Sequence, residues 1–310
     1  MRVATSRKPE AEHGRVPPSP ARDVLQLLRP AQWSKNAILF GALLFSKHLF
    51  DPPEVLRVVA AFASFCLVAS AAYVMNDLRD ADRDRRHPQK RFRPIPAGRV
   101  SPNTALLVGI GAGVGGLALA AALGMSFLAL VAFYLAWQVA YTFLMKEIVI
   151  LDVMALSVGF VVRAVAGGVV IDVPISPWLV ICTFLLALFM GFAKRRHEVI
   201  LLDAGAADHR RSLREYSPYF LDQMIAVVTA STVVAYAIYT VSPEVQEKLG
   251  TQYLYVTIPF VLFGIFRYLY LVHQKEEGGN PTQIMLTDAP LIVDVLLWAM
   301  TAAFVLYWGS

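Results

Sequence analysis

The sequence has little charge and almost no cysteine. Only 16% of its 310 residues are charged while 57% are hydrophobic, a composition that excludes an ordinary soluble domain and is typical of polytopic membrane proteins. The two cysteines, Cys66 and Cys182, lie in apolar stretches without CxxC spacing. We therefore expect them to be packing residues with no redox or metal role.

The beginning of the sequence lacks an apolar run. Residues 1–27 are polar and rich in proline and charge, so we expect a disordered cytoplasmic segment without a cleavable signal peptide. A single transmembrane domain is expected over 28–310. No internal repeat is visible beyond the succession of apolar spans.

Apolar windows recur along the rest of the sequence and predict an all-α membrane protein of about nine transmembrane helices. The windows cover 37–50, 56–75, 103–123, 126–141, 148–170, 177–192, 221–241, 253–272 and 289–308. Most of the 28 Lys and Arg residues fall before the first window, between the second and third, or between the sixth and seventh. Because basic loops stay inside, we expect an integral protein of the cytoplasmic membrane whose N-terminus is cytoplasmic.

Three carboxylates stand where the second window meets water. In the segment that begins at Asn76, a helix would place Asp77, Asp80 and Asp84 on one face. Clustered carboxylates need a cation, and oxygen ligands without nearby His or Cys suit Mg²⁺ held jointly with substrate phosphates. The alternative is a solvated helix end whose acids pair with the neighbouring arginines. The acids stand at the end of a membrane span, and this position favours the first interpretation, a site for a metal and a diphosphate.

Basic side chains in the cytoplasmic loops are the candidate phosphate ligands, although the positive-inside bias alone also explains basic loops. Lys90, Arg91 and Arg93 follow the acids in a proline-containing loop. Lys194 and Glu198, at i and i+4, either pair with each other or face the site. An acid inside a span is costly unless it is paired or bound to metal, which makes Asp152 a candidate. The other predicted substrate-binding residues are Lys35, Asn36, Tyr141, Lys146, Arg195 and Arg214.

Arg163 follows Asp152 by three helical turns, about 16 Å along the axis, so a direct pair between them is excluded. We expect Arg163 to have a structural role.

These motifs resemble the UbiA superfamily of intramembrane transferases, in which nine helices surround a cavity open to the cytoplasm and NDxxDxxxD binds Mg²⁺ and a diphosphate. Asn76, Asp77, Asp80 and Asp84 match every specified position of that motif. The resemblance implies that these four residues are catalytic and that the three aspartates are the metal ligands. It covers nearly all of the chain after Leu28.

Within the superfamily, members that transfer a prenyl group carry a second acid-rich motif after the sixth helix, where this chain has Lys194-Arg195-Arg196-His197-Glu198. The segments RPAQWSKN, LDVMALSVGFVVRAVAGG and RRSLREYSPYFL look more like the decaprenyl-phosphate phosphoribosyltransferase branch. That resemblance implies Mg²⁺-dependent transfer of 5-phosphoribose from phosphoribosyl pyrophosphate to a polyprenyl phosphate, for cell-envelope biosynthesis. A prenyltransferase for an aromatic acceptor and a transport protein are the two alternatives, the second disfavoured because the polar residues concentrate in cytoplasmic loops.

Overall fold

The computed structural model describes residues 20–86, 90–202, 211–275 and 278–309. All of the regular elements in these ranges are helical. They are α1 (Pro20–Leu28), η1 (Pro30–Phe40), α2 (Gly41–Phe45), α3 (Pro52–Asp84), η2 (Lys90–Phe92), α4 (Pro102–Leu123), α5 (Met125–Ala140), η3 (Tyr141–Met145), α6 (Leu151–Val170), α7 (Pro177–Leu202), η5 (Arg211–Arg214), α8 (Pro218–Val241), α9 (Pro243–Leu249), η6 (Leu254–Thr257), α10 (Ile258–Gln274), α11 (Pro281–Thr287) and α12 (Ala289–Trp308).

Eight helical stretches in the described residues are long and apolar enough to cross a membrane: α3, α4, α5 with η3, α6, α7, α8, η6 with α10, and α12. This confirms an integral membrane protein. The first expected span, 37–50, is different, because it is divided between the end of the 3₁₀-helix η1 and the short α-helix α2, which ends in a turn at Ser46 and Lys47. Lys47 has a positive φ of 62°, a conformation that closes the turn and prevents the helix from continuing.

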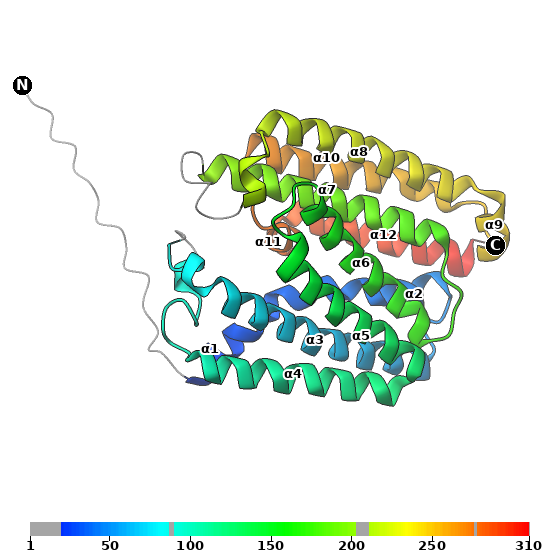
Figure 1. Ribbon diagram of the computed structural model, residues 1–310. Helices are drawn as coiled ribbons and strands as arrows, with labels where there is room; N and C mark the ends of the chain where they lie inside the picture. Colours follow the sequence, from blue (N-terminus) through cyan, green and yellow to red (C-terminus); the bar gives the residue numbers. More distant parts are fainter. Residues whose placement is uncertain (1–19, 87–89, 203–210, 276–277, 310) are drawn as a thin grey trace, which may run out of the picture.

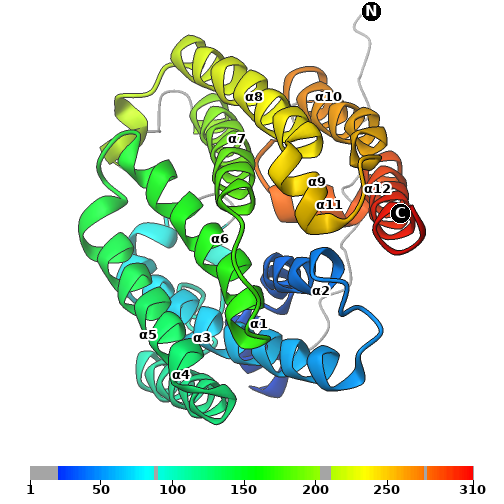
Figure 2. The ribbon, with the colours of Figure 1, turned by 90° about the vertical axis from the view of Figure 1, so that its right-hand side faces the viewer.

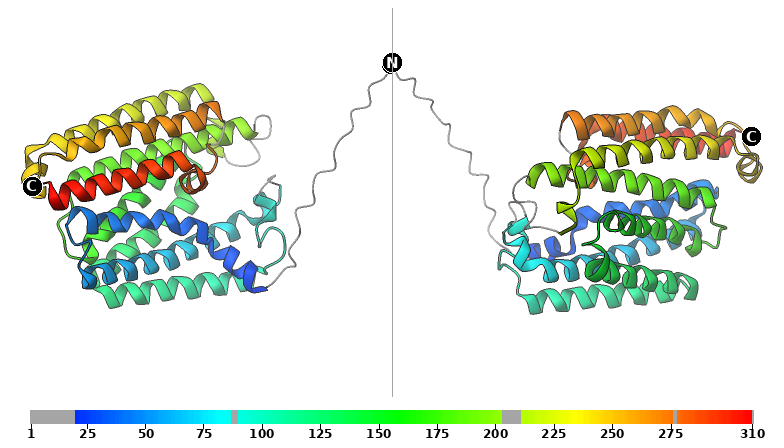
Figure 3. Two further views of the ribbon diagram at one scale, coloured as in Figure 1. Left: turned by 180° about the vertical axis from the view of Figure 1, so that it is seen from behind. Right: turned by 45° about the horizontal axis from the view of Figure 1, so that its top comes forward.

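The long helices run side by side and form a ring when the bundle is seen end-on (Figure 1, Figure 2). One buried core joins η1 and α2 with α3 to α6, and a second joins α6, α7, α8, α10 and the start of α12. Helix α6 contributes to both cores. The view from behind and the view tilted by 45° show α3 to α5 on one side of the molecule and α8, α10 and α12 on the other (Figure 3).

Helix α1 corrects the expected boundary of the N-terminal segment. Residues 1–19 lie outside the described part of the chain, but Pro20–Leu28 form a helix in which Leu27 is only 1% exposed. Leu27 packs beside Val74 and Ile95, and Asp23 accepts a hydrogen bond of 2.8 Å from Arg99. Its apolar contacts therefore extend the folded domain at least back to Pro20.

A glycine lets η1 lie directly against α6. A Cβ on Gly167 would collide with the backbone carbonyl of Leu39, so a larger residue there would force the two segments apart. This close approach matters because η1 carries Lys35 and Asn36 past the inner side of α3 and α6, where Asn36 meets Cys66 and Arg163.

Candidate active site

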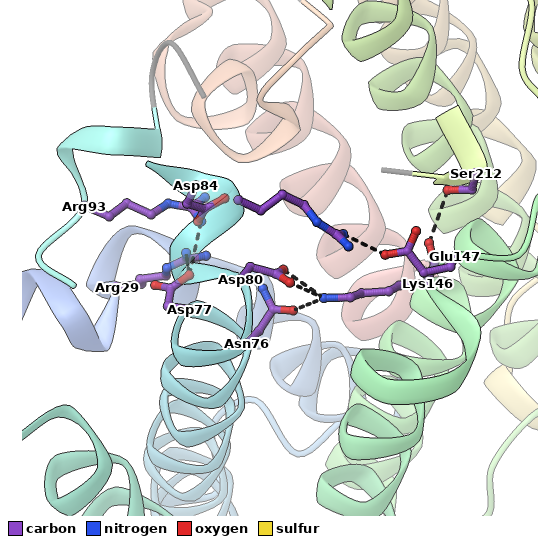
Figure 4. Close-up of polar contacts among 10 residues, drawn as sticks. Arg29, Asn76, Asp77, Asp80, Asp84, Arg93, Lys146, Glu147 and Ser212 are labelled. Atoms are coloured by element: carbon purple, nitrogen blue, oxygen red, sulfur yellow. Dashed lines mark hydrogen bonds and ion pairs between the residues drawn. The ribbon is translucent and has the colours of Figure 1, made fainter. Parts of the chain in front are cut away.

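The predicted carboxylates occupy the last turns of α3. This helix has 33 residues, several turns more than the roughly 20 needed to cross a bilayer, so its end extends beyond the apolar part of the bundle. Asp77 and Asp84 are buried, with 2% and 6% of their surface exposed. Figure 4 shows Asn76, Asp77, Asp80 and Asp84 among cationic side chains from other segments.

Asp77 and Asp84 share one cation. Nη1 of Arg93 lies 3.1 Å from Oδ1 of Asp77 and 2.6 Å from Oδ2 of Asp84. Arg29 also donates to Oδ1 of Asp77. The loop after α3 and the start of η1 thus both fold back onto this pair of carboxylates (Figure 4).

Asp80 turns toward a different cation. Nζ of Lys146 donates to its two carboxylate oxygens at 2.6 and 2.8 Å, and lies 3.4 Å from Oδ1 of Asn76. Lys146 is 1% exposed and follows the π-helical turn η3, a distortion often found at functional sites. Its carbonyl accepts a 3.2 Å hydrogen bond from Ser212, which connects this part of the site to η5.

A second charged network lies where α6 begins and α7 ends. Asp152 is fully buried and accepts hydrogen bonds from Nε of Arg195 and from the hydroxyl of Tyr216, both at 2.7 Å. Nη1 of Arg195 also donates to Glu198, which lies 3.8 Å from Lys194. Burial, and then the charge of Asp152, raises the pKa of Tyr216, so its hydroxyl stays protonated and donates to the carboxylate.

Strained backbone precedes Asp152. Ile150 has φ 67° and ψ −49°, and the amide of Leu151 bonds the carbonyl of Val149 at 2.7 Å. This is a γ-turn with positive φ, a rare conformation that is costly for a β-branched residue. The amide of Ile150 donates to the Tyr216 hydroxyl at 2.6 Å, so Tyr216 stabilises both the turn and the carboxylate that follows it.

Comparison with known proteins places this arrangement in a family. Residues 37–287 match the UbiA prenyltransferase family. The chain belongs to that family. It is similar to the decaprenyl-phosphate phosphoribosyltransferase of Corynebacterium glutamicum, with 33% identity over 94% of this chain and 90% of that protein. The protein of that name from Mycobacterium tuberculosis is 34% identical over 92% of this chain and 95% of its own length.

A solved structure shows the same fold. A UbiA homolog from Archaeoglobus fulgidus, bound to GPP and Mg²⁺, has a TM-score of 0.71 and 20% identity, over 92% of this chain and 99% of that one. The resemblance drawn from the NDxxDxxxD motif is thereby confirmed, as is the all-helical membrane fold. The chain is a transferase of the UbiA family.

Two of the carboxylates of this UbiA transferase contact one cation, and the third contacts another. One nitrogen of Arg93 lies within hydrogen-bond distance of both Asp77 and Asp84, so an ion between them would meet two oxygen ligands of the kind that Mg²⁺ prefers. Asp80 pairs instead with Lys146. Across the described ranges, no three acidic, His or Cys side chains gather at one point. Cations from other segments lie among the three aspartates, and one site made by all three stays a prediction.

One predicted phosphate ligand, Lys194 in α7, has charged neighbours from several segments. It lies 3.8 Å from Glu198, and the charges of Lys35 in η1 and Lys90 in η2 also act on it. Tyr141 is buried near Arg195. Their roles in binding remain predictions.

Other predicted ligands lie elsewhere. Arg195 is 2% exposed and its guanidinium already donates to Asp152 and Glu198, which places it in an ion-pair network instead of on an open surface. Asn36 is fully buried between Cys66 and Arg163. Arg91 lies over the ring of Phe92 at 4.8 Å, and Arg214 is exposed at the end of η5.

Two residues of the site were not predicted from the sequence. Arg29, which pairs with Asp77, lies in the left-handed region with φ 55° between α1 and η1. Its position directly before Pro30 was the available signal, because a residue before proline seldom continues a helix. Tyr216 had no such signal, since only the tertiary structure brings it to Asp152.

Proposed function

We propose that this UbiA transferase moves 5-phosphoribose from phosphoribosyl pyrophosphate to the phosphate of a polyprenyl phosphate, such as decaprenyl phosphate, and releases pyrophosphate. The reaction would depend on Mg²⁺ and take place on the cytoplasmic side of the membrane, to which the basic loops point. The product would serve as a precursor of arabinose donors in cell-envelope biosynthesis.

The observation that carries the proposal is the set of cations that several segments supply. Arg29, Arg93 and Lys146 lie against the three aspartates, and the charges of Lys35 and Lys90 act on Lys194. Prenyl transfer to an aromatic acceptor involves one diphosphate. The proposed reaction brings together a diphosphate, a 5-phosphate and a lipid phosphate, which needs more positive charge. Two relatives that match most of this chain bear the corresponding name.

The end of α7 also supports phosphoribosyl transfer over prenyl transfer. Where prenyl-transferring members have a second acid-rich motif, Glu198 is bound by Arg195 and lies 3.8 Å from Lys194. This carboxylate is thus compensated by protein cations. A second diphosphate-bound metal at this position is disfavoured, and a phosphate bound by Lys194 is favoured.

The proposed mechanism needs little proton transfer. The bond between ribose C1 and the pyrophosphate oxygen breaks as a bond forms from C1 to an oxygen of the lipid phosphate, and the electron pair leaves with pyrophosphate. The acceptor is already an anion, so no strong general base is required. Asp77 and Asp84, with Asp80 and Asn76 beside them, would hold Mg²⁺, which when bound would neutralise the departing pyrophosphate. Lys90, Arg93 and Lys146 would bind the donor phosphates and hold them for attack.

Donor choice tests the proposal. Purified protein in detergent would be incubated with Mg²⁺, polyprenyl phosphate and ribose-labelled phosphoribosyl pyrophosphate, with a parallel incubation in EDTA. A second reaction would offer prenyl diphosphate and a panel of aromatic acceptors. We expect label in the lipid phase only in the first reaction, and none with EDTA. Consumption of prenyl diphosphate with no lipid-linked ribose would refute the proposal and support prenyl transfer.

A further inference from the structure

Segment η1 presents three distinct faces. In a 3₁₀-helix, residues three apart lie above one another. Trp33, Asn36 and Leu39 form the face that packs inward, while Ala31, Ser34 and Ala37 form an exposed face. The third face, Gln32, Lys35 and Ile38, is half-buried. Lys35 is the only charged residue of this segment.

The inward face is held firmly. Trp33 donates to the Ser70 hydroxyl at 3.0 Å, and Nδ2 of Asn36 lies 3.3 Å from Sγ of Cys66. Arg163 donates to Oδ1 of Asn36 at 2.7 Å and also bonds the Tyr134 hydroxyl and the Gly159 carbonyl. These bonds set the rotation of η1 about its axis. The direction in which Lys35 extends is therefore set by Asn36 and Arg163.

The third face is directed toward the other half of the bundle. Gln32 meets Thr282 of α11, with 3.4 Å between Oε1 and the hydroxyl oxygen. The charge of Lys35 acts on Lys194 of α7. Lys35 thus extends into the region between η1, α7 and α11.

Lys35 lies near other cations. The charges of Arg163 and Arg29 act on it, and its own charge acts on Lys194 of α7, which also lies 3.8 Å from Glu198. In the part of the chain that the structure describes, its ammonium group has no hydrogen-bonding or ion-pair partner. Recessed cations close to one another are unfavourable without an anion between them. An anionic ligand at this position would remove the repulsion.

The depth of Lys35 points to the source of that anion. Its neighbours Trp33 and Asn36 contact Ser70 and Cys66 on α3, which precede Asp77 by roughly 10–16 Å along the helix axis. An anion held here lies farther into the apolar part of the bundle than the carboxylates do. A soluble donor bound by Asp77 and Asp84 has its pyrophosphate at the outer end, whereas an acceptor with a polyprenyl tail must bring its phosphate from the membrane.

We infer that Lys35, supported by Lys194, binds the phosphate monoester of the lipid acceptor, and that Arg163 and Asn36 are positioning residues that orient Lys35. The inference rests on the proposed function for the identity of the acceptor. The same phosphate chemistry is present in the 5-phosphate of the donor, so the test must separate the two sources.

Direct binding provides a test that does not depend on transfer. Farnesyl phosphate and farnesol would be titrated separately into purified wild type, Lys35→Gln, Lys35→Arg and Lys248→Gln, with no donor present. Lys248→Gln is the matched control, since it also removes one cation but in α9, where Lys248 contacts the carbonyl of Pro174. We expect Lys35→Gln to weaken farnesyl phosphate binding about tenfold, with Lys35→Arg closer to wild type, Lys248→Gln unchanged and farnesol unaffected.

Kinetics identify the source of the phosphate. With both substrates, Lys35→Gln should raise KM for the polyprenyl phosphate about tenfold and leave KM for phosphoribosyl pyrophosphate within about twofold. A rise in KM for the donor alone would assign Lys35 to the 5-phosphate and overturn the inference. Unchanged binding of farnesyl phosphate would overturn it as well.

These measurements distinguish a failure of the proposed function from a failure of the anion site at Lys35. If wild type transfers no phosphoribose but binds farnesyl phosphate through Lys35, the proposed function fails while the anion site stands. Lys35→Met, an apolar replacement of similar length, provides the same comparison if Lys35→Gln does not fold.

Discussion

Lys146 donates from one nitrogen to both carboxylate oxygens of Asp80, at 2.6 and 2.8 Å, and so joins the end of η3 to the end of α3. The lysine is 1% exposed and the side chain of the aspartate 15%. Because charges this far from water depend on each other, the pair links the folding of two helices to the geometry of the site.

The first prediction concerns this pair. Lys146→Met leaves Asp80 without its partner and should lower the free energy of unfolding by about 3 kcal/mol, the cost of leaving one charge of a buried pair uncompensated. Asp80→Asn with Lys146→Met should cost less than the sum of the two single changes. Thermal unfolding of the purified variants checks this, and additive effects would contradict a direct coupling.

The second prediction separates the carboxylates on α3. Asp77→Ala and Asp84→Ala should each abolish transfer while leaving a folded membrane protein, because each removes an oxygen donor that faces the shared cation position. Asp82→Ala is the control, since the Asp82 side chain is 90% exposed and pairs with Arg85. Initial rates of the three purified variants measure the effect. Near-normal activity in the Asp77 or Asp84 variant would refute the metal assignment.

The third prediction concerns Tyr216. Tyr216→Phe removes the hydroxyl that donates to Asp152 and accepts from the amide of Ile150. Leaving these buried groups unsatisfied should lower the free energy of unfolding by about 1–3 kcal/mol. Tyr219→Phe is the matched control because Tyr219 is 75% exposed, and it should change stability by less than about 0.5 kcal/mol. Equal melting temperatures for the two variants would show that the network contributes nothing.

The fourth prediction concerns Arg195. Arg195→Met leaves both Asp152 and Glu198 without the guanidinium that bonds them, so it should destabilise the protein by about 3–5 kcal/mol. Arg196→Met is the comparison, because the Asp222 side chain with which Arg196 pairs is 36% exposed and that pair contributes less. Chemical denaturation in detergent measures both. A smaller loss for Arg195→Met than for Arg196→Met would contradict the structural role assigned to Arg195.

The sequence predicted the long helices and the position of the acidic motif because both depend on local patterns. Apolar runs located eight of the expected spans, and the spacing of Asp77 and Asp84 brought them to one cation. The sequence did not predict that Arg93 would return to these two acids or that Lys146 would take Asp80 away from them. These contacts depend on the path of loops and on helix packing, which side-chain spacing does not encode.

The first span shows another limit. Its apolar residues predicted an ordinary transmembrane helix over 37–50, but η1 is tightly wound and lies against Gly167 of α6. Hydropathy reports that a segment is buried, and it does not report whether the segment winds as an α-helix or as a 3₁₀-helix. Asn36, predicted to bind substrate as part of the segment RPAQWSKN, is buried and accepts a hydrogen bond from Arg163, and its role in binding stays a prediction.

A measurement of both products of the transfer tests the proposed function most directly. Phosphoribosyl pyrophosphate labelled with ¹⁴C in the ribose and with ³²P in the terminal phosphate of the diphosphate would be incubated with purified protein, Mg²⁺ and polyprenyl phosphate. We predict equal amounts of ¹⁴C in the lipid phase and ³²P in aqueous pyrophosphate, both lost in Asp77→Ala. Lipid that carries ³²P, or pyrophosphate released without lipid-linked ¹⁴C, would contradict the proposed transfer.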